Sequence, residues 1–326
     1  MSTSDSRQPV LVTGATGLVG GEIALELQRS GYQVTALVRL GSDTSHLTKS
    51  DIVIAEGDVT DPDAVARAMD GQTYVCHAAA LVPGTGASDR EFEPVNLGGT
   101  RIVCEAAINA GVSRLLHVST AHVFGIHPGS NVDEESGPAT THPGYDASKV
   151  KAEALVLNYA AGPLDAVIVN PAIVYGPRSR HSGRLIKLFI SGKLPVIPLP
   201  NRHLSLVYSG DVAFGTRLAL EVGARGERYI LVAPPVTVRE FITALADASG
   251  RRLPRLSLPE WAVTIGVGAA WAARPITRWR PPVTIRGIRG GGTVYDGGRA
   301  VRELGMEYTT IEVGLASTVE WMTNTP

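Results

Sequence analysis

A glycine-rich turn near the start of the chain constrains the fold more than any other feature of the sequence. Gly14, Gly17 and Gly20 follow a short apolar run over 10–13, which predicts a buried strand, and they open a segment over 18–30 that predicts a helix. In such a strand–turn–helix, Gly14 allows the tight turn, Gly17 lets backbone approach a pyrophosphate, and Gly20 lets helix and strand pack closely. Amide N–H groups at the helix N-terminus then bind phosphate oxygens. The turn therefore predicts a nucleotide site.

The rest of the first half alternates apolar strands with helices. Asp61 stands directly before one of these helices, where a carboxylate caps free N–H groups. The alternation predicts an α/β fold, a Rossmann doubly wound parallel sheet with ligand sites at the carboxyl ends of its strands. The expected strands are 33–38, 51–55, 73–77, 114–118 and 166–170, and the expected helices are 62–69, 96–110 and 146–160.

The alternation stops after Pro177, where we expect a smaller, mixed carboxyl-terminal substrate lobe. Three prolines in 194–200 favour a loop or an edge strand. We therefore divide the chain into a dinucleotide-binding domain over 1–176 and a substrate lobe over 177–326, with segments around 204–232 returning to the Rossmann core. In the lobe we expect helices over 238–248, 260–273, 298–304 and 311–322, and a loop over 281–298 with a short strand near Val294.

Composition excludes several classes of partner. The formal net charge is -1 and the arginines are scattered, so we expect no nucleic-acid binding. No run reaches the roughly 20 apolar residues of a spanning helix. Cys76 and Cys104 lie in apolar stretches, which favours a reduced, cytoplasmic protein, and residues 1–9 lack the regions of a signal peptide. No Cys/His cluster has metal-ligand spacing, so we predict no metal.

Further motifs follow the glycine turn along the chain: Gly57-Asp58-Val59, His77-Ala78-Ala79-Ala80, Asn96 within 95–100, Tyr145-x-x-x-Lys149, and 171–178. Together with the G-x-x-G-x-x-G turn, they resemble the extended short-chain dehydrogenases/reductases (the NAD-dependent epimerase/dehydratase family) over nearly the whole chain. The resemblance implies that the cofactor is held by Gly14, Thr16, Gly17, Leu18, Val19, Gly20, Asp58, Val59, Ala78, Ala79, Ala80, Ser119, Lys149, Pro171, Ala172, Ile173 and Val174. It also implies a structural role for Asn96, as a buried amide that bridges helix and strand.

Arg39 indicates which cofactor is used. An enzyme for NAD(H) usually has an acid at the end of the second strand, which accepts a hydrogen bond from the ribose 2′-OH. Here that place carries Arg39, and no acid occurs until Asp43. A guanidinium suits a 2′-phosphate and also stacks on adenine. We therefore expect NADP(H) rather than NAD(H).

Tyr145 and Lys149 are the expected acid–base pair. A phenol has an unperturbed pKa near 10, and a neighbouring ammonium favours phenolate. A spacing of four residues places both side chains on one face of a helix, with Cβ atoms ~5–6 Å apart. We expect Tyr145 to act as general acid in reduction, with Lys149 lowering its pKa and holding the nicotinamide ribose. The resemblance implies Thr120 as the third catalytic residue, four residues before Phe124, with Ser119 as the alternative.

The substrate is less constrained. Apolar residues over 194–206 and 260–273 predict a hydrophobic cleft, and the layout resembles the branch that holds dihydroflavonol reductases, aldehyde reductases and 3β-hydroxysteroid dehydrogenases. We expect a hydrophobic carbonyl or alcohol, with His122, Val82 and Leu204 near it. Sugar-nucleotide epimerases commonly have an arginine at the Leu204 position; Arg202, two residues away, keeps an epimerase as one alternative. A non-catalytic NADP(H)-sensing protein is the other.

Two expectations concern larger partners. The segment 261–280 carries Trp261, Trp271, Trp279, Arg274, Arg278 and Arg280, and its uninterrupted apolar stretch, 261–273, is too short to span a bilayer. It forms either a lid or core helix, which we favour, or a contact with a membrane surface. The family's habit implies a homodimer built on the helices near 96–110 and 146–160. The apolar residues compatible with that interface, or with a monomer core, are Ile102, Val103, Ala107, Leu155 and Leu157.

Overall fold

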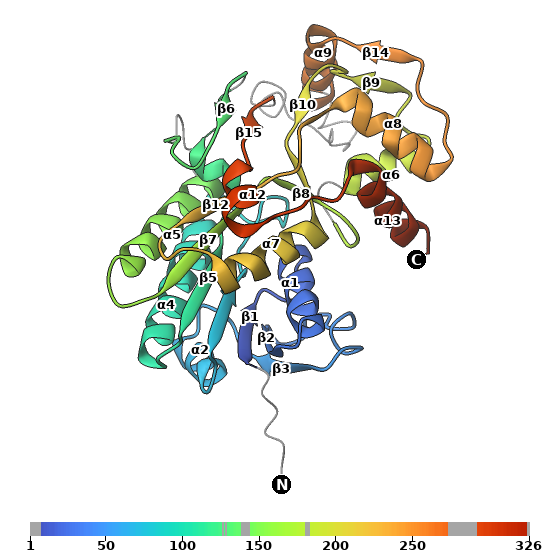
Figure 1. Ribbon diagram of the computed structural model, residues 1–326. Coiled ribbons are helices and arrows are strands. Elements are labelled where there is room, and N and C mark those ends of the chain that lie inside the picture. Colours follow the sequence, from blue (N-terminus) through green and yellow to red (C-terminus); the bar gives the residue numbers. More distant parts are fainter. Residues whose placement is uncertain are drawn as a thin grey trace.

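A sheet of seven parallel strands forms the centre of the computed structural model, which describes residues 8–125, 127, 129–137, 144–179, 183–272 and 292–324 (Figure 1). The strand order is β12-β7-β5-β4-β1-β2-β3. The strands are β1 Pro9–Thr13, β2 Gln33–Val38, β3 Ile52–Glu56, β4 Tyr74–His77, β5 Arg114–Val118, β7 Ala166–Pro171 and β12 Arg228–Leu231. The order reverses between β1 and β4, and parallel sheets of this kind bind ligands outside such a switch point.

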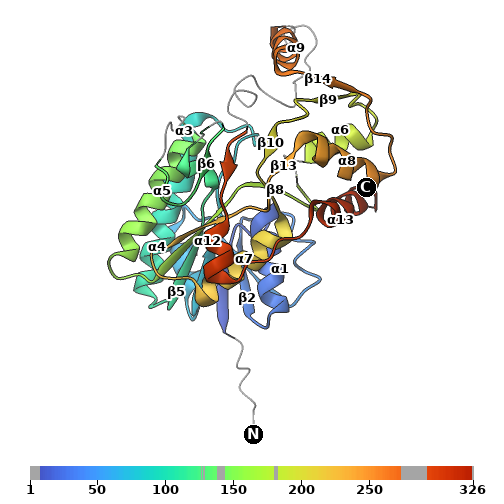
Figure 2. The ribbon, with the colours of Figure 1, turned by 45° about the horizontal axis from the view of Figure 1, so that its top comes forward.

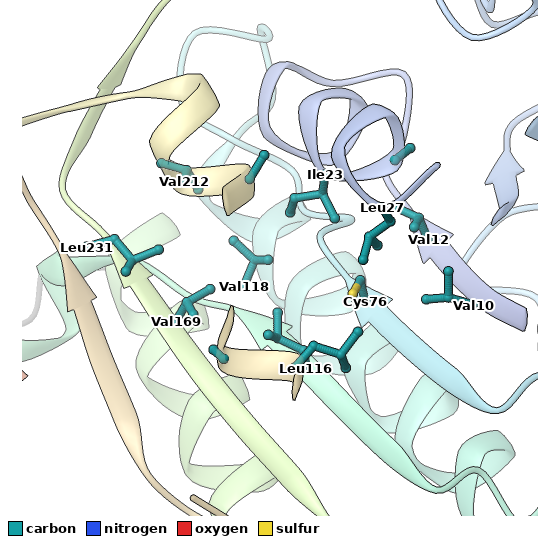
Figure 3. Packing of buried hydrophobic residues seen from close by; sticks show 14 of the residues in the cluster. Val10, Val12, Ile23, Leu27, Cys76, Leu116, Val118, Val169, Val212 and Leu231 are labelled. Atoms are coloured by element: carbon teal, nitrogen blue, oxygen red, sulfur yellow. The ribbon is translucent and has the colours of Figure 1, made fainter. Parts of the chain in front are cut away.

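Helices cover both faces of the sheet, because successive residues of each strand point to opposite sides. Val10 and Val12 pack with α1 (Leu18–Arg29), α7 (Ser209–Val222) and α12 (Gly298–Leu304). Leu11 packs on the other side with α2 (Pro62–Met69), α4 (Gly99–Asn109) and α5 (Tyr145–Ala160). Figure 3 shows Leu27 of α1 and Val212 of α7 within the first of these clusters. The doubly wound sheet predicted from the sequence is confirmed.

The helical region predicted over 96–110 begins earlier than expected. α3 (Asp89–Glu93) is capped at Ser88, whose N–H and hydroxyl both donate to Glu91. A π-helical turn over Pro94–Gly98 joins α3 to α4. Pro94 has no N–H to donate, so the regular ladder of hydrogen bonds is interrupted there, and a single wider turn accommodates the break. This turn carries Asn96 into the interior, where it is 1% exposed.

The chain leaves the sheet after β7 and later returns to it. β8 (Ile173–Tyr175) pairs in parallel with β11 (Leu206–Tyr208), after which α7 packs against α1, and β12 pairs with β7. Helix α7 was not predicted, and neither was α6 (Gly183–Ile190). The remaining short elements are η2 (Ala121–Phe124), β6 (Asn131–Val132), β10 (His203–Leu204), β13 (Val236–Thr237) and β15 (Val294–Tyr295).

A second core lies in the carboxyl-terminal lobe. Residues of α6, β9 (Val196–Pro198), α8 (Val238–Ser249) and α13 (Ile311–Asn324) form this core. β9 pairs with β14 (Leu256–Leu258) in a small two-stranded sheet, so the edge strand expected in 194–200 is present.

Helix α9 (Glu260–Ala272) lies at the outer end of this lobe, beyond β9 and β14 (Figure 2). The expected loop over 281–291, Trp279 and the arginines at 274, 278 and 280 lie outside the described residues. Among the helices that are described, none is long and apolar enough to cross a membrane.

Candidate functional site

The glycine turn is held by contacts that leave no room for a Cβ atom. Gly14 has a φ of +73°, and a Cβ there would lie 2.7 Å from the Cα of Ala79. A Cβ on Gly20 would lie 2.3 Å from the carbonyl oxygen of Gly14. Gly17 is the N-cap of α1 and has no side chain to cap the helix. The N–H groups at the start of α1 therefore face a backbone-lined cradle of the kind that fits a pyrophosphate.

The loop after β4 closes one side of this cradle. The Ala79 N–H donates to the hydroxyl of Thr13, 3.2 Å away, and that hydroxyl lies 2.8 Å from Nδ1 of His77. Nε2 of His77 in turn lies 3.0 Å from the hydroxyl of Thr100. Burial, together with the Lys149 ammonium, lowers the pKa of His77 to about 3, so the imidazole is a neutral link. The expected cofactor residues Ala78, Ala79 and Ala80 are thus fixed against the glycine turn.

Arg39 lies at the end of β2 on the wall of an open cavity of about 420 Å³. Arg67 lines the same cavity. Glu56, Asp58 and Asp61 also line it, and the carboxylates of Asp58 and Asp61 accept hydrogen bonds, from Thr60 and from the first turn of α2 respectively. The cavity, at the carboxyl ends of β2 and β3, therefore contains the guanidinium groups of Arg39 and Arg67.

Tyr145 is the first residue of α5, and Thr120, directly after β5, lies close enough to its hydroxyl to lower its pKa. The Tyr145 ring packs edge-on against Phe92, with ring centroids 5.9 Å apart. Thr120 is 9% exposed and follows β5 directly, so the pair lies at the carboxyl end of a central strand. The structure therefore brings together two of the three expected catalytic side chains.

Lys149 lies one turn further along α5 and is 2% exposed. Its Nζ donates to the carbonyl of Val118, 2.9 Å away, and lies 3.4 Å from Nε2 of His117. A lysine only donates, so His117 accepts at Nε2. Burial lowers the pKa of Lys149 to about 8, although the carboxylate of Glu153 raises it.

The expected effect of Lys149 on Tyr145 differs from the structure. Burial, followed by the carboxylate of Asp146, raises the pKa of Tyr145 to about 12, and the Thr120 side chain opposes this rise. The Lys149 ammonium donates to the Val118 carbonyl at the end of β5 and does not lower the pKa of Tyr145 here. Thr120, rather than Lys149, is the group that favours the Tyr145 phenolate here.

Glu153 and Asn170 belong to this centre and were missed in the sequence. Asn170 donates from Nδ2 to Glu153, 2.7 Å away, and to the carbonyl of Thr120, 3.3 Å away. Glu153 also lies 3.5 Å from Arg228. Burial raises the pKa of Glu153, and its bonds with Asn170 and the charges of Arg228 and Lys149 lower it. Glu153 stands four residues after Lys149, so the spacing that identified Tyr145 and Lys149 also predicts its face of the helix.

Asn96 has the bridging role that the sequence predicted. It accepts from the Leu81 N–H, donates to the Leu81 carbonyl, and donates to the hydroxyl of Ser148. The Ser148 hydroxyl then donates to the carbonyl of Tyr145. Asn96 therefore ties the loop after β4 to the first turn of α5.

The remaining expected cofactor residues frame the same sheet edge. Val59 packs against Gly99 at the start of α4, and Ser119 is buried after β5. Pro171 ends β7, and the Ala172 N–H donates to the carbonyl of Leu231. Ile173 is 46% exposed and Val174 is partly buried. Arg178, with a φ of +66°, then pairs with Glu22 of α1, 2.9 Å away.

The three expected substrate residues do not all lie at one site in the structure. His122 lies on η2, with Nδ1 3.3 Å from the carboxylate of Asp146, the residue after Tyr145. Val82 is exposed on the loop after β4. Leu204 pairs with Val236 and packs against the core of the carboxyl-terminal lobe. His122 is therefore the one with a contact at the catalytic centre. Within the described ranges, no three His, Cys, Asp or Glu side chains cluster as metal ligands would.

Comparison with known proteins gives the class. The profile of the NAD dependent epimerase/dehydratase family matches residues 10–232. "Sterol demethylase protein B" of Methylococcus capsulatus is 32% identical over 95% of this chain and 97% of its own. The "4-hydroxy-2-methyl-3-oxo-4-farnesyl-3,4-dihydroquinoline-1-oxide ketoreductase" of Stigmatella aurantiaca is also 32% identical, over 73% of this chain and 72% of its own.

A solved structure shares the whole architecture. DesIV, a dTDP-glucose 4,6-dehydratase from Streptomyces venezuelae with NAD bound, is 26% identical, covers 98% of both chains, and has a TM-score of 0.77. The chain belongs to the NAD-dependent epimerase/dehydratase family, that is, to the extended short-chain dehydrogenases/reductases.

Proposed function

We propose that this protein is an NADP(H)-dependent oxidoreductase that reduces the carbonyl of a hydrophobic small molecule, or oxidises the corresponding alcohol. The observation that carries the proposal is that Tyr145 lies against Thr120 where β5 ends, one helical turn from Lys149. The roles of the cofactor residues named above, and the division into a cofactor domain over 1–176 and a substrate lobe over 177–326, are parts of this proposal.

The side chains support acid–base work on a carbonyl. A nicotinamide cofactor, when bound, would supply the hydride for the carbonyl carbon, so the residues here must deal with the negative charge that develops on the oxygen. Thr120 donates a hydrogen bond to that oxygen, and Tyr145 transfers its proton there. A pKa of about 12 makes Tyr145 a proton donor at neutral pH, and an alkoxide is basic enough to take that proton. Lys149, cationic below about pH 8, offsets the charge left on the phenolate.

Arg39 supports NADP(H) over NAD(H). Its guanidinium lies at the end of β2, where an acid would bind a ribose 2′-OH, and Arg67 lines the same cavity. A phosphate dianion there gains charge-assisted hydrogen bonds, each contributing about 1.5–3 kcal/mol. Glu56 also lines this cavity, the Asp58 and Asp61 carboxylates accept hydrogen bonds within local turns, and the two guanidinium groups supply the positive charge that a 2′-phosphate needs.

A hydrophobic substrate is supported by the names of the relatives. One relative is named as a sterol demethylase protein and another as a ketoreductase of a farnesylated quinoline oxide, so apolar ring systems recur among their printed names. We also propose a cytoplasmic homodimer. Both cysteines are buried and free, which suits a reducing compartment. Val103 and Ala107 are fully buried in the monomer's own core, so a dimer interface on α4 and α5 would use Ile102, Leu155 and Leu157 instead.

The test is oxidation of NADPH, with NADH alongside, against a panel of hydrophobic ketones, aldehydes and sugar nucleotides. We expect turnover with a ketone, a preference for NADPH, and loss of at least a thousandfold in Tyr145→Phe. Tyr159→Phe is the matched control, because Tyr159 lies on the same helix but bonds to Glu105 near its far end. Tight NADPH binding without consumption of any panel member would favour a redox-neutral epimerase or a non-catalytic NADP(H) sensor instead.

A further inference from the structure

Glu153 is a buried acid beside the catalytic centre. It lies on α5, is 3% exposed, and accepts at Oε2 from Nδ2 of Asn170, 2.7 Å away. The same Nδ2 donates to the carbonyl of Thr120, 3.3 Å away. An ionised carboxylate and a carbonyl only accept, so both hydrogens of the Asn170 amide are committed. The Glu153 carboxylate is therefore held in place within the network that contains Thr120.

Lys149 and Glu153 lie on the same face of α5, which packs against β7 beside β5 (Figure 1). Four residues separate them, so their Cβ atoms are ~5–6 Å apart. Their charged ends bind neighbouring strands. Nζ of Lys149 donates to the carbonyl of Val118, and Asn170 follows Val169, the residue that pairs with Val118 in the β5–β7 register. Neighbouring strands are about 4.8 Å apart, so the ammonium and the carboxylate lie close together in the interior.

The other titratable groups beside Lys149 are neutral. Burial, together with the Lys149 ammonium, lowers the pKa of His77 on β4 to about 3 and lowers the pKa of His117 on β5 well below its usual value. Burial raises the pKa of Tyr145 to about 12. Among the described residues, the acid whose charge raises the pKa of Lys149 is Glu153. Glu153 is therefore the negative charge that opposes loss of a proton from Lys149.

Arg228 of β12 supports the ionised form of Glu153. Its Nη1 lies 3.5 Å from Oε1 of Glu153, and its guanidinium lies over the ring of Phe124, 4.9 Å from the ring centroid. Burial of a carboxylate is unfavourable unless positive charge and hydrogen bonds compensate it. Arg228 supplies such a charge from the side of the carboxylate that Asn170 does not occupy, because the two bind different oxygens.

We propose that Glu153 is a positioning residue that acts through Lys149, whose ammonium it keeps charged at neutral pH. A charged Lys149 offsets the negative charge that remains on Tyr145 when the phenol gives up its proton. Without the Glu153 carboxylate, Lys149 loses its proton nearer to neutral pH and that compensation is lost. The effect on turnover rests on the proposed function, whereas the effect on the charge of Lys149 does not.

The test is an NMR titration of the lysine side chains in the cofactor-free full chain, with carbon-13-labelled lysine. The chain has five lysines, and Lys149→Met assigns the Lys149 signal by its loss. Two charges roughly 6 Å apart, at an effective dielectric constant near 20, change a pKa by about one to two pH units. Glu153→Gln keeps an oxygen that accepts from Asn170 and removes the charge. We therefore expect Lys149 to titrate at least about one pH unit lower in this variant.

The matched control is Glu93→Gln. Glu93 pairs with Lys151 on the same helix as Lys149, 2.8 Å away, and both side chains of that pair are 53% exposed. Its removal should leave the titration of Lys149 unchanged, because solvent screens an exposed pair.

A second variant covers the case in which an unpaired Arg228 prevents Glu153→Gln from folding. Glu153→Gln with Arg228→Gln removes both charges of the pair, and we expect the same fall in the pH at which Lys149 titrates. Titration of Lys149 at the pH of the parent in either variant would overturn the proposal.

Turnover separates this proposal from the proposed function. With a ketone and NADPH, we expect the fall of kcat at alkaline pH to move to lower pH in Glu153→Gln, by the same amount as the Lys149 titration, with KM for the ketone unchanged. A parent that turns over no member of the panel would refute the proposed function, and the NMR titration would still decide the role of Glu153. An active parent with an unchanged Lys149 titration in Glu153→Gln would overturn the role of Glu153 alone.

Discussion

Gly20→Ala tests the geometry of the glycine turn most sharply. The added Cβ atom would lie 2.3 Å from the Gly14 carbonyl oxygen and 2.6 Å from its carbon, whereas a carbon–oxygen contact needs roughly 3.2 Å. Helix α1 or the turn must therefore move by about 0.9 Å. Overpacking of this kind costs ~1–3 kcal/mol, and alanine's better helix propensity returns at most ~1 kcal/mol. We expect a net loss of about 1–2 kcal/mol of stability.

The same displacement moves the amide groups that face the expected pyrophosphate. A shift near 1 Å weakens several hydrogen bonds at once, so we expect NADPH to bind at least tenfold more weakly. The assay is calorimetric titration with NADPH beside urea unfolding. Gly98→Ala is the matched control: Gly98 is helical, with φ −62° and ψ −49°, and a Cβ there meets nothing within 4 Å. A Gly20→Ala protein with the stability and the NADPH affinity of the parent would refute the reasoning.

Three further predictions follow from the same site. Arg39→Ala should weaken NADPH binding by roughly tenfold to a hundredfold and leave the affinity for NADH unchanged. Both affinities are measured by titration, with the exposed residue change Arg101→Ala as control. Equal losses for both cofactors would refute a 2′-phosphate contact. Thr120→Val removes the hydroxyl that favours the Tyr145 phenolate, so turnover should fall about a hundredfold with NADPH affinity retained; unchanged turnover would exclude Thr120 from catalysis. The pKa of Lys149 is lowered to about 8 in the folded chain, so the unfolded chain binds more protons between about pH 8 and pH 10.5. The free energy of unfolding should therefore rise with pH in this range, by up to ~3 kcal/mol relative to Lys149→Met, as measured by urea unfolding. Parallel stability curves for the two proteins would contradict that shift.

Most elements of the fold could be predicted from local sequence patterns. Asp61 was predicted as an N-cap and does accept from the first turn of α2, because capping depends on a few neighbouring residues. Strands 33–38 and 114–118 match β2 and β5 residue for residue, since short apolar runs bounded by polar residues are read locally. Helix α6 was missed although Leu185, Ile186 and Phe189 have helical spacing, because Pro177 and the three prolines of 194–200 flank it and favour irregular structure.

The catalytic centre was harder to predict where it depends on contacts between distant segments. The placement of Tyr145 and Lys149 one turn apart on α5 follows from helix spacing, but the direction of the Tyr145 pKa shift follows from burial, which spacing does not reveal. The contacts of Asn170 with Glu153 and Thr120 join α5, β7 and the end of β5, and no local pattern encodes that junction. The burial of Val103 and Ala107 likewise depends on which face of α4 meets the sheet.

Transfer of a labelled hydride tests the central claim most directly. The panel reaction is run with NADPH that carries deuterium at the transferred position, and the product is analysed by mass spectrometry. We predict one deuterium at the carbinol carbon of a reduced hydrophobic product, with one NADPH consumed for each product formed. A product that is an isomer of its substrate, formed with no net consumption of NADPH, would contradict the account and identify a redox-neutral enzyme.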